Sequence, residues 1–245
     1  MVISSRDIAL MCPGQASQKV GMCEDIYINS EFGKEHIDLA NNILGYDIKK
    51  IMFSGPIEML TKTIYTQPAI FIASYIVGSI LIHNGLRPKF IAGHSVGEIS
   101  AYALARSLSF EDGLKLVQFR ATAMHEAGSI KSGSMAAVIG LNEESLQGHC
   151  ANYTNGIVCV ANYNSPNQAV ISGDSIAIEN ISPELLKAGA IKVIKLNVSG
   201  AFHSPLMEPA KDKLDKYIQD VDISDAIFPV SVSYTHLTLP TKRIV

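Results

Sequence analysis

A serine flanked by glycines at the end of a short apolar run sets the strongest limit on the fold of this chain. Residues 89–93 form the run, the motif Gly93-His94-Ser95-Val96-Gly97 overlaps its end, and residues 96–105 have a helical pattern. In α/β proteins a G-x-S-x-G motif joins a buried strand to a helix through a tight turn. These residues therefore predict a strand, a sharp turn and a helix in direct succession.

Strand and helix patterns also alternate elsewhere in residues 1–130. Residues 7–12 are apolar and end at Pro13-Gly14, which is typical of a strand entering a loop. Residues 67–84 predict a helix with Pro68 near its first turn, and residues 110–126 predict another helix. This alternation favours an α/β fold with a mainly parallel sheet.

The middle of the chain has a different order, in which the expected elements run strand, helix, strand, strand, helix, strand. Strands are expected at residues 134–141, 157–162, 168–173 and 191–198, and helices at 143–153 and 183–188. This order is the ferredoxin-like pattern. We therefore expect a small ferredoxin-like subdomain at residues 131–198, inserted into a large domain formed by residues 1–130 and 199–232.

Composition and charge limit the class of protein. Hydrophobic residues make up 47% of the 245 residues and charged residues 18%, which is typical of a globular protein with a core. The net charge of −3 does not suggest nucleic-acid binding. The four cysteines form no C-x-x-C pair, so we expect idle thiols and no metal site. The most apolar segment, residues 69–82, is too short to span a membrane, so we expect a soluble, cytoplasmic protein.

Ser95 is the candidate nucleophile. The two glycines of its motif allow a strained turn that raises the hydroxyl above the sheet, and the start of the next helix offers free N–H groups to an oxyanion. The alternative is a glycine-rich turn with an ordinary helix-capping serine. The strand pattern before Ser95 and the helix pattern after it favour the nucleophile.

A serine nucleophile needs a base, and His203 is the candidate. It follows the strand expected at residues 191–198 and precedes Ser204-Pro205, which is a typical helix start. We therefore expect it at the carboxyl end of a strand, where open α/β sheets build their sites. The alternative is a hydrogen-bonded loop histidine without a chemical role.

Arg120 is the candidate for binding an anion. It shares one face of the helix expected at residues 110–126 with Leu116 and Met124. A guanidinium among apolar neighbours needs an anionic partner, because an unpaired buried charge is costly. That partner is either an internal carboxylate or a substrate carboxylate, which a guanidinium binds with two parallel hydrogen bonds. Spacing alone leaves both alternatives open.

Five motifs occur in order along the chain: Pro13-Gly14-Gln15-Ala16-Ser17-Gln18, Gly93-His94-Ser95-Val96-Gly97-Glu98, Gln118-Phe119-Arg120, Asn162-Tyr163-Asn164-Ser165-Pro166 and Gly200-Ala201-Phe202-His203-Ser204. Together they resemble the malonyl-CoA:acyl-carrier-protein transacylases, and the resemblance extends over about residues 7–230.

The resemblance implies a hydrolase-like large domain, a ferredoxin-like insert and acyl transfer through a dyad of Ser95 and His203. It implies that the backbone N–H groups of Gln15 and Val96 form the oxyanion hole, and that Arg120 binds the malonyl carboxylate. It also implies that malonyl-CoA and an acyl carrier protein are the partners and that no metal or bound cofactor is needed.

Further expectations concern the partners. We expect a monomer that binds neither nucleic acid nor a membrane. Carrier proteins are typically acidic, so the chain needs a local basic patch, for which Lys187, Lys192 and Lys195 are candidates. The alternative is that these lysines are only solvated.

Two features depart from the family pattern. Ala16 stands where the family usually has glycine, so we expect a slightly reshaped first loop. Family members also continue beyond the end of this chain, and residues 233–245 do not resemble their continuation. We expect a truncation joined to an unrelated tail there, and a poorly active chain.

Two other functions compete with acyl transfer. A serine esterase would use an acid that lies between Ser95 and His203 in the sequence, and Asp174 occupies such a position. An esterase has no use for Arg120 in its pocket. A non-catalytic docking module for carrier proteins would need neither the serine nor the histidine.

Overall fold

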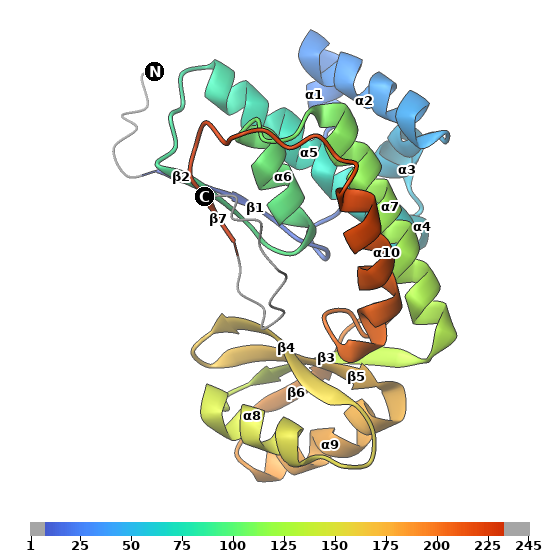
Figure 1. Ribbon diagram of the computed structural model, residues 1–245, viewed down its shortest axis with the longest axis vertical. Coiled ribbons are helices and arrows are strands. Elements are labelled where there is room, and N and C mark those ends of the chain that lie inside the picture. The colour runs from blue at the N-terminus through green and yellow to red at the C-terminus, as the bar shows by residue number, and fades with distance from the viewer. Residues whose placement is uncertain (1–7, 233–245) are drawn as a thin grey trace. The chain divides into compact units, whose positions relative to one another are not determined.

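The computed structural model describes residues 8–232, which form two compact units (Figure 1). One unit holds the described residues up to Ala121 together with those from Tyr217, and the other is Thr122–Lys216. The unrelated tail expected at residues 233–245 lies outside the described residues.

The first unit contains a parallel sheet with the strand order β1-β2-β7 among the described residues. β1 is Ala9–Cys12, β2 is Phe90–Gly93 and β7 is Val230–Ser231. In the register of β1 and β2, Cys12 is paired with Gly93, so the two strands end at the same edge of the sheet. This sheet and the helices between its strands confirm the predicted α/β fold.

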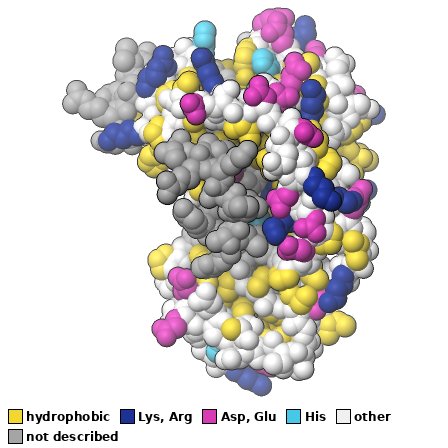
Figure 2. All heavy atoms as spheres, in the orientation of Figure 1, with side chains coloured by type: hydrophobic (Ala, Val, Ile, Leu, Met, Phe, Trp, Pro, Cys, Tyr) yellow, Lys and Arg dark blue, Asp and Glu magenta, His cyan; other side chains and the backbone are white. Residues whose placement is uncertain are grey.

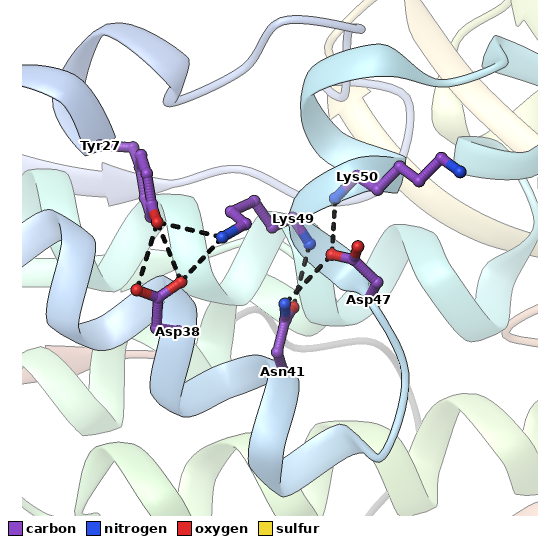
Figure 3. A network of polar contacts seen from close by, with 6 residues as sticks. All are labelled: Tyr27, Asp38, Asn41, Asp47, Lys49 and Lys50. Atoms are coloured by element: carbon purple, nitrogen blue, oxygen red, sulfur yellow. Dashed lines mark hydrogen bonds and ion pairs between the residues drawn. The ribbon is translucent and has the colours of Figure 1, made fainter.

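The helices before β2 are tied together by polar contacts as well as by apolar packing. They are α1 (Glu24–Asn29), α2 (Glu31–Leu44), α3 (Ile48–Ser54), α4 (Ile57–Leu60) and α5 (Thr63–His83). Tyr27 of α1 and Lys49 of α3 both donate hydrogen bonds to the carboxylate of Asp38 of α2, over 3.1 and 3.0 Å (Figure 3). One carboxylate therefore joins three helices.

Helix α5 is longer than predicted, because it begins at Thr63 and not at residue 67. Pro68 consequently lies inside the helix. Ile70, Phe71 and Ile72 are fully buried in the first unit. Among the described residues α5 is the one helix long and apolar enough to cross a membrane by length and composition, and 50% of its most apolar window is buried.

The second unit is built on an antiparallel sheet with the strand order β4-β5-β3-β6. Its elements in chain order are β3 (Gly133–Ile139), α8 (Glu143–Asn152), β4 (Val158–Ser165), β5 (Gln168–Asp174), α9 (Ser175–Lys187) and β6 (Lys192–Lys195). The predicted βαββαβ order is confirmed, and the central position of β3 and β5 is that of a ferredoxin-like sheet.

Both faces of this small sheet are covered. Ala136 and Val138 of β3 face one apolar cluster, which includes residues of α8 and α9. Met135, the neighbour of Ala136, packs in a second cluster with Met124 of α7 (Phe110–Ile130) and with Phe202. Alternate residues of a strand point to opposite faces, so one short strand contributes to both clusters.

Helix α9 differs from the sequence expectation of residues 183–188, because it begins at Ser175. Pro183, which suggested a helix start, lies inside it. An internal proline removes a backbone hydrogen bond and costs about 3 kcal/mol. Ile178, Ile181 and Leu185 are buried along one face and offset this cost. Beyond β6 the chain forms a 3-10 turn at Pro205–Met207 and helix α10 at Glu208–Ile218.

Candidate active site

The turn that carries Ser95 is fixed by close backbone contacts. Helix α6 (Val96–Leu104) begins directly after it, and Ser95 has φ 55° and ψ −114°, a strained conformation for a residue other than glycine. A Cβ atom on Gly93 would lie 2.1 Å from the carbonyl carbon of Gly97, and one on Gly97 would lie 2.2 Å from the oxygen of Cys12. The glycines therefore let the strand, turn and helix pack together, as the motif predicts.

Arg120 lies beside Ser95 in the first unit. Its Nη2 donates a hydrogen bond of 3.1 Å to Ser95 Oγ, and its Nη1 donates one of 2.5 Å to Oε1 of Gln67. Burial lowers the pKa of Arg120 to about 10, although nearby Glu98 acts in the opposite direction, so the guanidinium is charged at neutral pH. Within residues 8–232 this guanidinium forms no ion pair. The internal carboxylate considered from the sequence is therefore not found in the described part of the chain.

A buried amide, Gln67, connects Arg120 to the loop after β1. Its Nε2 donates to Oε1 of Gln15 over 3.1 Å and to Oγ1 of Thr63 over 3.0 Å. The Thr63 hydroxyl in turn donates to the same Gln15 oxygen over 2.7 Å. The sequence did not identify Gln67 or Thr63 as site residues. Their signal was a pair of polar residues at the start of an apolar helix, since buried polar groups need hydrogen-bond partners.

The two predicted oxyanion-hole donors, Gln15 and Val96, belong to segments that pack together. A Cβ on Gly97 would also lie 2.7 Å from the oxygen of Pro13, so the loop after β1 contacts the first turn of α6. Neither the Gln15 N–H nor the Val96 N–H donates to an acceptor within the described range of the chain. Both groups can therefore still bind an oxyanion, and their role there remains a prediction.

Ala16 is strained in the way that its departure from the family pattern suggests. Its φ is 83°, which lies in the left-handed region that favours glycine. Its N–H donates a hydrogen bond of 2.9 Å to Oε1 of Gln18. The loop thus keeps a turn with an alanine at a position where glycine would be unstrained.

His203 belongs to the second unit and occupies a firmly held loop. Its φ is 57°, and the next residue, Ser204, is buried and donates through its hydroxyl to the oxygen of Ala201 over 2.6 Å. Phe202 anchors the loop in the apolar cluster that includes Met135. His203 was expected at the carboxyl end of the strand at residues 191–198, but that strand, β6, ends at Lys195 and pairs antiparallel with β3, so the analogy with the strand ends of an open α/β sheet was wrong. Its pairing with Ser95, a residue of the other unit, stays a prediction.

Asp174, the acid that an esterase triad would use, is engaged elsewhere in the second unit. Its Oδ2 accepts a hydrogen bond of 2.9 Å from the Ile157 N–H, and its Oδ1 pairs with Lys131 over 2.6 Å. These contacts, first the backbone N–H and then the lysine, lower the pKa of Asp174. The carboxylate has a structural role at the end of β5, and both of its oxygens are occupied.

The lysines considered for a basic patch are exposed in the second unit. Lys187 ends α9 and Lys192 begins β6, while Lys195 pairs with Glu179 over 2.7 Å. On the face drawn in Figure 2, basic and acidic side chains are interspersed over the surface. The basic patch remains a prediction.

The chain is similar to known acyl transferases over most of its length. The family model for the acyl transferase domain matches residues 10–236. The malonyl CoA-acyl carrier protein transacylase of Bacillus subtilis is 39% identical over 225 residues, which are 91% of this chain and 71% of that protein.

Solved structures agree with this similarity. The malonyl CoA-acyl carrier protein transacylase of Coxiella burnetii has a TM-score of 0.89 to this chain at 36% sequence identity. The match covers 92% of this chain and 72% of that chain. A malonyl-transacylase in complex with a type II polyketide synthase acyl-carrier protein has a TM-score of 0.87 at 36% identity, with 92% and 74% covered. The family match, the sequence identity and the shared fold lead to one conclusion: this chain belongs to the acyl transferase domain family.

Proposed function

We propose that this chain transfers a malonyl group from malonyl-CoA to the pantetheine thiol of an acyl carrier protein through an ester on Ser95. The relatives named for this activity support the proposal, and so does the complex of a related transacylase with a carrier protein. The observation that carries it is the hydrogen bond of 3.1 Å between the Arg120 guanidinium and the hydroxyl of Ser95.

A charged group next to the nucleophile selects the acyl group. The two acceptors that Arg120 contacts, Gln67 and Ser95, are both neutral. Among the described residues these contacts use two of the five N–H donors of the guanidinium, which leaves three for a carboxylate. A malonyl thioester carries a free carboxylate close to its reactive carbonyl, and such an anion can pair with the partly buried guanidinium, which has no carboxylate partner among the described residues.

The proposed reaction has two half-reactions. His203 takes the proton from Ser95, whose oxygen attacks the thioester carbonyl, and the N–H groups of Gln15 and Val96 stabilise the oxyanion. The carbon–sulfur bond breaks, and the proton passes from His203 to the leaving thiol of coenzyme A. The carrier thiol then attacks the malonyl ester, His203 accepts its proton and returns one to Ser95. Each proton transfer and each bond change in the two half-reactions is assigned to a residue of this chain or to a substrate, and the proposal includes no metal or bound cofactor.

The contacts of Asp174 argue against the alternative of a serine esterase. An esterase triad would use Asp174 to orient the base, but both oxygens of Asp174 are held by Ile157 and Lys131. An esterase also gains nothing from a cation beside its nucleophile.

The setting that we propose is a monomer in the cytoplasm that binds neither nucleic acid nor a membrane.

The decisive experiment measures which nucleophile discharges the acyl-enzyme. The chain is loaded with malonyl-CoA, freed of excess substrate, and mixed either with buffer or with an acyl carrier protein that bears its pantetheine arm. We expect a malonyl adduct in the intact mass that transfers to the carrier much faster than it hydrolyses. Hydrolysis at the same rate with and without carrier would support the esterase instead.

A further inference from the structure

Gln67 lies between the proposed carboxylate site and the loop that carries a proposed oxyanion donor. Its side chain is fully buried within α5. The amide can take only one orientation, because a guanidinium has donors alone and Arg120 must therefore meet the oxygen of Gln67. The amide nitrogen then faces Gln15 and Thr63, whose oxygens both accept from it. The surroundings thus specify an amide, with one accepting end and one donating end.

The neutral charge of this amide matters as much as its hydrogen bonds. The contact with Oε1 of Gln67 restrains the Arg120 guanidinium at Nη1 while Nη2 remains bound to Ser95. A carboxylate at the same place would also accept from the guanidinium, but it would neutralise the charge. An aliphatic side chain would leave the charge intact but would not restrain the planar group. An amide restrains the guanidinium and leaves its charge available to a substrate.

We propose that Gln67 is a positioning residue that sets the preference for malonyl over acetyl groups by orienting Arg120 without neutralising it. This inference rests on the proposed function, because it assigns Gln67 to the same site. A residue that only filled space in α5 would affect the transfer of both acyl groups equally.

The test compares Gln67→Glu and Gln67→Leu with the wild-type chain, using malonyl-CoA and acetyl-CoA with one carrier protein. We expect both variants to lower the ratio of kcat/KM for malonyl to that for acetyl by roughly tenfold to a hundredfold, the range for loss of one charge-assisted contact. In Gln67→Glu the loss should appear mainly in KM for malonyl-CoA, because the new carboxylate competes with the substrate for Arg120. Acetyl transfer that is retained shows that a variant is folded. If the buried glutamate of Gln67→Glu prevents folding, the malonyl-to-acetyl ratio of Gln67→Leu decides the test.

Thr66→Val is the matched control. Thr66 is also fully buried in α5, but its hydroxyl donates to the oxygens of Leu60 and Lys62 and not to the Arg120 network. We expect lower stability and an unchanged malonyl-to-acetyl ratio. The positioning role of Gln67 would be contradicted if the malonyl-to-acetyl ratio did not change in both Gln67 variants, or if it fell equally in Thr66→Val. Either result would leave the proposed function standing. A wild-type chain that transfers no malonyl would contradict the proposed function and this inference with it.

Discussion

The two units hold the two residues of the proposed dyad in different ways. Ser95 and His203 both have a left-handed φ, 55° and 57°, which is unfavourable for residues other than glycine. Around Ser95 the strain is maintained by backbone contacts that only glycines allow. Around His203 it is maintained by the Ser204 hydroxyl and the buried ring of Phe202. Strained conformations persist where the surroundings over-determine them, and this comparison shows two separate ways to do so.

The charged groups of the two units differ as well. In the first unit Arg120 contacts neutral acceptors and keeps its charge available. In the second unit Asp174 is paired with Lys131 and bonded to a backbone N–H. A cation that forms no ion pair with another described residue is suited to bind an anion, whereas the paired carboxylate stabilises the fold.

The largest expected effect comes from Ser95→Ala. We expect no malonyl adduct in the intact mass and a fall in transfer on the order of 10⁴-fold or more, because the nucleophile is absent. Ser100→Ala is the control, since Ser100 is a buried serine of α6, the helix that follows Ser95. An undiminished adduct in Ser95→Ala would mean that another residue is acylated.

His203→Ala tests the second unit in the same reaction. We expect adduct formation to slow by about 10²–10⁴-fold, the typical contribution of a general base. Stopped-flow mixing with malonyl-CoA measures this rate. Ser204→Ala loosens the loop but keeps the imidazole, so its rate should fall less. Equal rates for wild type and His203→Ala would make His203 a structural loop residue.

Arg120→Ala should change specificity more than catalysis. A hydrogen bond to a charged group contributes about 1.5–3 kcal/mol, which corresponds to roughly tenfold to a hundredfold in the malonyl-to-acetyl ratio of kcat/KM. Steady-state kinetics with both thioesters measure the ratio. If it does not change, the guanidinium only supports the structure of the first unit.

Asp174→Asn should affect stability and leave acyl transfer intact. We expect a loss of about 0.5–1 kcal/mol at pH 7, because the partner Lys131 is largely exposed and its charge is screened. The pKa of Asp174 is lowered in the folded state, so its contribution is full above the unfolded carboxylate pKa of about 3.9 and is lost as the pH falls below it. Urea unfolding, measured at pH 7 and at acidic pH, checks this prediction. Glu179→Gln is the control, because Glu179 and its partner Lys195 are both exposed and the substitution should hardly change stability. A loss of transfer would revive the esterase triad.

Ala16→Gly should have the smallest effect. The left-handed φ of Ala16 costs roughly 1–2 kcal/mol, whereas glycine adds about 0.5–1 kcal/mol of unfolded-state entropy. We expect a net gain of about 0.5 kcal/mol in the free energy of unfolding. Ala188→Gly, at a right-handed position after α9, should instead lower stability by about 0.5–1 kcal/mol. Equal signs for the two substitutions would contradict the account of strain in the first loop.

The sequence predicted those parts of the fold that depend on local pattern. The apolar run before Gly93 and the helix after Ser95 were placed within about one residue of β2 and α6, because the tight turn needs both glycines. The ferredoxin-like order was also predicted, because alternation and the turn before Gln168 are local signals. The prolines at 68 and 183 misled the helix starts, because buried apolar faces outweigh the local cost of proline.

Local patterns along the chain were enough to predict the order of the elements and to identify Ser95, His203 and Arg120 as candidates. The partners of Arg120 depend instead on tertiary packing: it contacts Ser95 and Gln67 and forms no ion pair with another described residue. The physical reason is that a buried polar group takes whichever partner the packing of distant helices brings to it, and a pattern along the chain carries no information about that distance. Gln67 and Arg120 are 53 residues apart and meet only because α5 and the part of α7 up to Ala121 fold into the same unit.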